Sequence, residues 1–178
     1  MEIDMKKNSL NIGLILGGIL LLIATFVYTI NYKLFLDIYL GFVISFTIIS
    51  AGTYSTFKTR TINGGTITFG NAFKSYFIAT AIGYLIYWVW NFIIYTIIDT
   101  DAARAIDEQA MLMAKEMFEG LGLSREMIAL SMDEMSKNSS FSLSNILATY
   151  CFKLIGYSFF GLITSLIFFL LSPPKRKD

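Results

Sequence analysis

The stretch from Asn63 to Ile98 reads NGGTITFGNAFKSYFIATAIGYLIYWVWNFIIYTII, and it joins a glycine-rich turn to a long hydrophobic segment that carries regularly spaced polar groups. Six of these groups follow one another at spacings of four, four, three, four and four residues. On a helix they share one face. They are Tyr76, Thr80, Tyr84, Tyr87, Asn91 and Tyr95. A helix that faced only lipid would not need this polar stripe, so we expect it to contact other helices or to line a polar path.

The hydrophobic content of the chain indicates an integral membrane protein. Of its 178 residues, 55% are hydrophobic. Four hydrophobic segments are long enough to cross a hydrocarbon core of ~30 Å. We place these spans at about 11–30, 35–57, 74–98 and 150–172. The predicted fold is therefore an all-α membrane protein with four transmembrane helices.

The first span is expected to stay in the protein instead of being cleaved as a signal peptide. Its apolar run is longer than that of a signal peptide, and Glu2 and Asp4 precede it. Gly13 and Gly17 form a GxxxG pair, which allows close approach of a neighbouring helix but is also ordinary for a membrane segment.

A separation of charge lies behind the net charge of only +1. Residues 99–142 hold nine acidic and four basic residues, so this segment carries −5 and the rest of the chain +6. In the predicted topology eight of the basic residues near the span ends lie on one side of the membrane, and Lys33 lies with the acidic segment on the other side. The eight are Lys6, Lys7, Lys58, Arg60, Lys74, Lys175, Arg176 and Lys177. The positive-inside rule then places both termini in the cytoplasm and residues 99–142 outside it.

The acidic segment between the third and fourth spans is too long for a simple loop, and its sequence predicts a helical hairpin. Asp99 and Asp101 can cap a first helix, which Gly120 and Gly122 would end. Ser124 can cap a second helix. We therefore expect an acidic, extracytoplasmic hairpin over residues 99–142.

The hairpin is also rich in methionine, with six of the eight methionines of the chain. They are Met111, Met113, Met117, Met127, Met132 and Met135. Thioethers can bind monovalent copper, and they can also form an adaptable contact with a partner or with lipid. Because these residues recur at helical intervals, we expect them chiefly to form the core of the hairpin.

Two groups of residues resemble a known family. The first is the glycine pair Gly64 and Gly65 with Phe69, Gly70, Ala72, Phe73 and Lys74, and the second is Gly122, Leu123 and Ser124 of the hairpin. Together with the order of spans, they resemble the bacterial integral membrane proteins catalogued as domain of unknown function 4199. The resemblance implies a four-span protein of the bacterial inner (cytoplasmic) membrane, and it implies no activity, substrate or catalytic residue.

Several classes of chemistry lack their usual residues in this sequence. There is no histidine, and Cys151 is the single cysteine, which removes histidine-based metal and haem sites and Ser-His or Cys-His nucleophiles. Ser158 lies five residues from Lys153, which is not one helical face, so a Ser-Lys pair is not favoured. We expect no enzymatic activity, no cofactor, no bound metal and no nucleic acid partner.

Two functions from different classes remain. The first is a scaffold or interaction protein that presents the hairpin to a membrane or periplasmic protein, or to a second copy of the chain. The second is a small oligomeric transporter or channel in which the polar stripe lines a path. The stripe carries no charge, whereas ion and proton pathways usually contain one at depth, so the first function is favoured.

Overall fold

The computed structural model describes residues 2–137 and 139–172, and within them the chain is helical with no strand. The elements in order are α1 (Glu2–Asn31), the 3₁₀ helix η1 (Tyr32–Leu36), α2 (Ile38–Ile62), α3 (Phe69–Phe92), the π-helix η2 (Ile93–Ile98), α4 (Thr100–Gly120), α5 (Arg125–Ser136) and α6 (Leu143–Leu170). Pro173, Pro174 and the predicted basic cluster of Lys175, Arg176 and Lys177 lie outside the described residues.

Four helical segments are long and apolar enough to cross a membrane, which confirms the predicted fold class. They are Asp4–Leu36, Ile38–Ile62, Phe69–Ile98 and Leu143–Leu170. All four begin before the expected spans or extend past them, because the polar residues that flank each apolar run continue the same helix.

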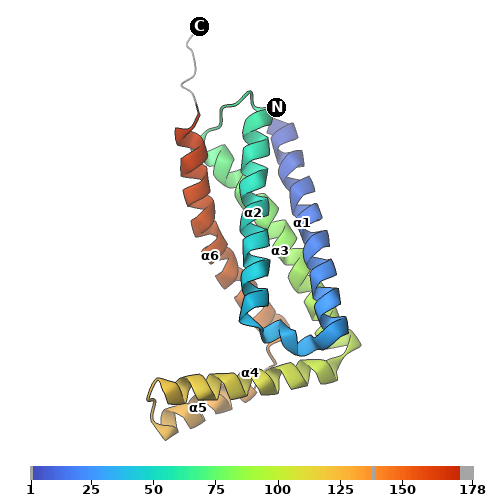
Figure 1. Ribbon diagram of the computed structural model, residues 1–178, viewed down its shortest axis with the longest axis vertical. Helices are drawn as coiled ribbons and strands as arrows, with labels where there is room; N and C mark the ends of the chain where they lie inside the picture. The colour runs from blue at the N-terminus through green and yellow to red at the C-terminus, as the bar shows by residue number, and fades with distance from the viewer. Residues whose placement is uncertain (1, 138, 173–178) are drawn as a thin grey trace.

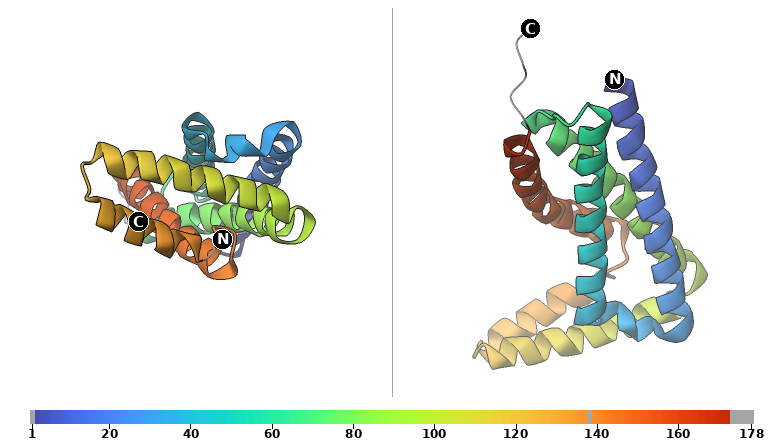
Figure 2. Two further views of the ribbon diagram at one scale, coloured as in Figure 1. Left: turned by 90° about the horizontal axis from the view of Figure 1, so that it is seen from below. Right: turned by 45° about the horizontal axis from the view of Figure 1, so that its top comes forward.

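The four long helices stand side by side in a bundle, and α4 and α5 lie across one end of it (Figure 1). We call this the hairpin end. The start of α1, the connection from α2 to α3 and the end of α6 meet at the other end, which we call the basic end because Lys6, Lys58 and Lys74 lie there. The tip of the hairpin projects sideways past the lower ends of α2 and α6 in Figure 1, and past both helices when the molecule is seen from below (Figure 2, left).

Helix α3 is the centre of the bundle, because it packs against α1, α2 and α6. Glycines make its approach to α1 close. A Cβ on Gly13 would lie 3.0 Å from the backbone oxygen of Ala79, and one on Gly17 would lie 2.4 Å from Cδ1 of Ile86. The GxxxG pair is therefore a site of helix contact, and side chains there would push α1 and α3 apart.

The glycine-rich connection between α2 and α3 is a tight turn. Gly64 and Gly65 have φ angles of 71° and 83°, a backbone region that glycine adopts without strain. Arg60 donates from Nε to the carbonyl of Gly65 at 2.8 Å and from Nη2 to the carbonyl of Leu171 at 2.7 Å. This side chain thus joins the turn to the C-terminal end of α6, where a cation is favourable.

Candidate functional site

The polar stripe of α3 and η2 lies inside the bundle. All six side chains are buried, and the most exposed of them, Tyr87, has only 7% of its surface accessible. The structure therefore brings the whole predicted stripe to one face, and that face contacts other helices of the same chain.

Tyr76 shows how closely this face is packed. Its ring lies between two glycines, since a Cβ on Gly52 of α2 would come within 2.7 Å of the ring and one on Gly161 of α6 within 2.6 Å. The ring is fully buried, and its hydroxyl has no hydrogen-bond partner within the described residues. The two glycines thus form a slot for the Tyr76 ring, and the slot holds α2, α3 and α6 together.

Further along the stripe, aromatic rings fill the space between α3 and α6. The ring of Tyr84 stacks on those of Tyr87 and Tyr150, with centroids 5.9 and 5.7 Å away, and meets Tyr157 edge-on at 5.3 Å. The Tyr150 hydroxyl donates to the carbonyl of Ala81 at 3.1 Å. The rings interlock, and the hydroxyls of Tyr150 and Tyr157 contact Ala81 and Ser45 within the bundle, so this part of the stripe is a packing surface.

Asn91 belongs to the same packing surface. Its side-chain Nδ2 donates to the carbonyl of Tyr87, one turn earlier in the same helix, at 2.7 Å. The neighbouring Trp90 donates from Nε1 to Oγ1 of Thr25 in α1 at 2.8 Å. The amide nitrogen of the one carboxamide of the stripe is therefore bound by its own helix.

The hairpin begins at the predicted cap. Oδ1 of Asp99 accepts from the backbone N–H of Ala102 at 2.9 Å, and Oδ2 accepts from the hydroxyl of Tyr28 at 2.9 Å. These two hydrogen bonds, the backbone one first, hold the pKa of the Asp99 carboxyl below its usual value. At the far end, Gly122 has a φ of 73° and Ser124 caps α5 through the backbone N–H of Met127 at 3.3 Å. These helix starts were predicted from local sequence alone.

A cluster of aromatic rings attaches the hairpin to the bundle. At its centre is Phe141, which lies between α5 and α6 in sequence and is only 2% exposed. Its ring centroid is 4.4 Å from that of Tyr95 and 5.3 Å from that of Phe35. The ring of Phe35 in turn contacts Trp88 edge-on. We call Phe35, Trp88, Tyr95 and Phe141 the junction cluster.

Polar contacts hold the same junction. Thr96 donates to the carbonyl of Phe141 at 3.2 Å, and the backbone N–H of Ser140 donates to Oδ1 of Asp107 at 3.1 Å. The first bond links η2 to the segment before α6, and the second links that segment to α4. The base of the hairpin is therefore fixed in position relative to the spans.

The methionines are placed differently from the prediction. Met113, Met117, Met127 and Met135 are exposed to between 39% and 57%, and Met111 and Met132 are half-buried. The expectation that all six form the hairpin core is wrong, because the buried side chains of the hairpin are Ala102, Ala103, Ile106 and Ile128. Regular spacing on a helix shows that residues share a face, and it does not show what covers that face.

The face of α4 that carries Ile106 continues toward the hairpin tip. Ile106 is buried where α4 contacts η1 and η2. Met113 follows after two turns and lines a groove with Leu34 of η1 and Ile38 of α2. Met117 comes one turn later and is 57% exposed. A single apolar face of α4 thus starts against the bundle and runs beyond it.

The opposite face of α4 is charged. It carries Glu108, Lys115 and Glu119, all exposed, and other exposed carboxylates lie on α5. The basic residues of the hairpin are partly neutralised, since Arg104 pairs with Asp101 at 3.4 Å and Lys115 with Glu119 at 4.0 Å. By contrast, Glu108, Glu116 and Glu126 have no ion pair in the part of the chain that the structure describes.

A second polar feature lies at the basic end, and the sequence analysis missed it. The hydroxyl of Ser75 contacts three other hydroxyls, those of Ser9 at 2.9 Å, Ser55 at 2.8 Å and Thr59 at 2.7 Å. Asn8 donates to the Thr59 hydroxyl at 3.0 Å. We call these five residues the hydroxyl cluster. Its only signal in the sequence is the four-residue spacing of Ser55 and Thr59, which does not reveal their partners on α1 and α3.

One of the comparisons with known proteins identifies a family. The family model described as a protein of unknown function (DUF4199) matches residues 11–169, from the first predicted span almost to the end of α6. No curated protein and no solved structure matches the chain. The family match covers all four spans and the hairpin, so the chain belongs to the DUF4199 family.

Proposed function

We propose that this protein is a non-enzymatic interaction protein, in which four transmembrane helices hold the α4–α5 hairpin at the membrane surface and present its acidic face to a protein with a basic surface. The observation that carries the proposal is the orientation of the hairpin. Its base is fixed by the junction cluster, Ile106 of α4 is buried where α4 contacts η1 and η2, and the charged residues Glu108, Lys115 and Glu119 lie on the opposite side of α4.

The bilayer itself supplies the contact for the apolar face. A hairpin that lies across the ends of the spans runs along the membrane surface, and the spans place lipid beside it. Met113 and Met117 then rest on the boundary between headgroups and acyl chains, as the apolar face of an interfacial helix does. The exposure of the methionines fits this contact.

Charge favours a basic partner for the exposed, acidic surface of α4 and α5. The unpaired carboxylates Glu108, Glu116 and Glu126 attract cations, and complementary charge mainly raises the rate and selectivity of association. The charge distribution also supports an orientation with the basic end in the cytoplasm and the hairpin outside, in the inner membrane of a bacterium.

The transport function has less support. A path along the stripe needs space and water, whereas the six stripe side chains are buried against α1, α2 and α6. Asn91 binds its own helix, so Asn91→Leu should leave a function of the hairpin intact. Deletion of the hairpin should abolish that function. The reverse pattern would favour transport.

Photo-crosslinking in intact cells tests the proposal. A photoreactive residue at position 108, on the charged face, should capture one reproducible protein, and one at position 117 should capture lipid. Introducing Glu116→Lys and Glu126→Lys into the protein labelled at 108 should abolish the protein capture. The matched Lys115→Glu and Arg125→Glu protein should retain it.

Two results would contradict the proposal. Capture that is unchanged by the charge reversals would show that the acidic face does not recruit the partner. Capture of only a second copy of this chain would make the hairpin an oligomer contact. Recovery of the same partner from membranes with wild-type protein, and its loss on raising the salt concentration, would support an electrostatic contact.

A further inference from the structure

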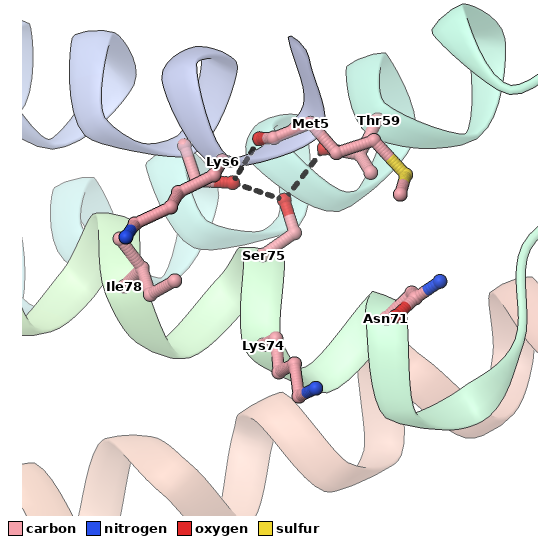
Figure 3. Close-up of a pocket in the computed structure, with 8 residues that line it drawn as sticks. Met5, Lys6, Thr59, Asn71, Lys74, Ser75 and Ile78 are labelled. Atoms are coloured by element: carbon pink, nitrogen blue, oxygen red, sulfur yellow. Dashed lines mark hydrogen bonds between the residues drawn. The ribbon is translucent and has the colours of Figure 1, made fainter. Parts of the chain in front are cut away.

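A pocket at the basic end opens between α1 and α3, above the hydroxyl cluster. Its volume is about 240 Å³, and Lys6 of α1 and Lys74 and Asn71 of α3 line it together with Ser9 and Ser75. Figure 3 shows Ser75 pointing from α3 toward α1 and Thr59, with Lys6 extending from α1 beside Ile78 and with Lys74 and Asn71 extending from the first turns of α3, away from Ser75. The space would hold about eight waters of ~30 Å³, so a phosphate group fits easily.

The floor of the pocket is rigid because its hydrogen bonds are complete. A hydroxyl can donate once and accept twice, and Ser75 has three hydroxyl neighbours. The contacts allow an ordered chain from the Asn8 amide through Thr59 and Ser75 to Ser9, which donates to the carbonyl of Met5 at 3.0 Å. The cluster thus fixes α1, α2 and α3 in register, and with them the positions of the two lysines.

The charged groups left to bind a ligand are both cations, and Asn71 adds an amide donor. Lys6 and Lys74 are exposed, and neither has an ion-pair partner within the described residues. Among the described residues, none of those that line the pocket carries a carboxylate. Two ammonium groups and a carboxamide around one opening select an anion, and phosphate oxygens accept strongly from ammonium groups.

The surroundings of the pocket indicate how that phosphate is supplied. Leu14 follows Lys6 on α1 after about two turns, and it is 58% exposed. On α3, Ile78 lines the pocket and Leu85 beyond it is 44% exposed. Apolar surface therefore runs from the pocket along the spans, in the direction that acyl chains take from a headgroup.

We propose that the pocket binds a phosphate group supplied by the headgroup of an anionic phospholipid in the adjacent leaflet. The phosphate lies at the mouth of the pocket, within reach of the long, exposed side chains of Lys6 and Lys74, and the acyl chains follow the exposed surface of α1 and α3. A zwitterionic lipid binds less well, because its own ammonium group is brought toward two lysines. This inference does not depend on the function proposed for the hairpin.

Native mass spectrometry of the full-length protein in detergent tests the proposal. Phosphatidylglycerol should bind to the wild-type protein more tightly than phosphatidylcholine. The double variant Lys6→Gln, Lys74→Gln should lose at least about tenfold in affinity for phosphatidylglycerol, because a cation near an anionic headgroup contributes roughly fivefold. The matched control, Lys33→Gln with Lys153→Gln, removes two exposed lysines elsewhere and should bind like wild type.

Three outcomes would overturn the assignment. Equal affinity for the two lipids would remove the selectivity for an anionic headgroup. Equal loss in the control variant would show that only net charge matters. If inorganic phosphate at millimolar concentration displaced the lipid, and protected the wild-type protein but not the double variant against thermal unfolding, the pocket would belong to a soluble phosphate and not to a lipid.

Discussion

The two ends of α3 are packed by different means. At the basic end, Ser75 meets hydroxyls of α1 and α2, and these small side chains allow the helices to lie close together. At the hairpin end, Tyr95 meets Phe35 and Phe141, and these large rings fill the space between η1, η2 and the segment before α6. Hydrogen bonds fix the register of the spans at one end, and ring packing attaches a surface element at the other.

This difference predicts unequal sensitivity to single substitutions. Hydrogen bonds between membrane helices contribute about 0.6 kcal/mol on average and up to about 1.7 kcal/mol, whereas truncation of a buried phenylalanine costs about 3–5 kcal/mol. The hairpin should therefore be easier to detach than the bundle is to loosen.

The largest effect is expected for Phe141→Ala, which removes the central ring of the junction cluster. We expect a loss of about 3–5 kcal/mol in the stability of the hairpin attachment, measured as protease cleavage of α4 and α5 in membranes. Phe152→Ala makes the same chemical change at a side chain that is 76% exposed, and it should leave cleavage unchanged. Equal cleavage of both variants would mean that the junction cluster does not hold the hairpin.

Gly161→Ala should have the next largest effect, because the new methyl would meet the buried ring of Tyr76 at 2.6 Å. Overpacking of this kind costs about 1–3 kcal/mol, measured as the free energy of unfolding in mixed micelles. Gly156→Ala in the same helix has no neighbouring atom within 4 Å and serves as the control. If the two variants unfold alike, the slot is less rigid than the packing indicates.

Ser75→Ala tests the basic end directly. The substitution takes away the common partner of Ser9, Ser55 and Thr59, and we expect a loss of about 1–2 kcal/mol in the free energy of unfolding. In Ser158→Ala the lost hydroxyl bound only the carbonyl of Leu154 in its own helix, so the cost should be smaller. A larger effect for Ser75→Ala than for Phe141→Ala would reverse the comparison between the two ends.

The smallest effect is expected at Asp99 and depends on pH. Because the pKa of its carboxyl is lowered in the folded protein, its stabilising contribution is complete above the usual pKa of about 3.9 and is lost as the pH falls through the lowered value. Protease cleavage of the hairpin should therefore rise below about pH 4. Asp99→Asn keeps a capping oxygen and cannot titrate, so its cleavage should not change over this range. Identical pH profiles would assign the transition to another group.

Local sequence was sufficient for much of the fold. Apolar length predicted the four spans, and the caps at Asp99 and Ser124 predicted where the hairpin helices begin, because these signals act within a few residues. The stripe from Tyr76 to Tyr95 was predicted to share one face for the same reason.

The functions of these faces depend on contacts that are distant in sequence. The sequence determined by itself the spans, the caps and the periodicity, since each follows from the helical repeat and the hydrophobicity of neighbouring residues. Only the tertiary structure decided that the stripe is a packing surface, that Met117 stays exposed, and that Ser75 contacts Ser9, which is 66 positions away in the sequence. Which helix covers a given face is set by the packing of all four spans, and no local pattern encodes it.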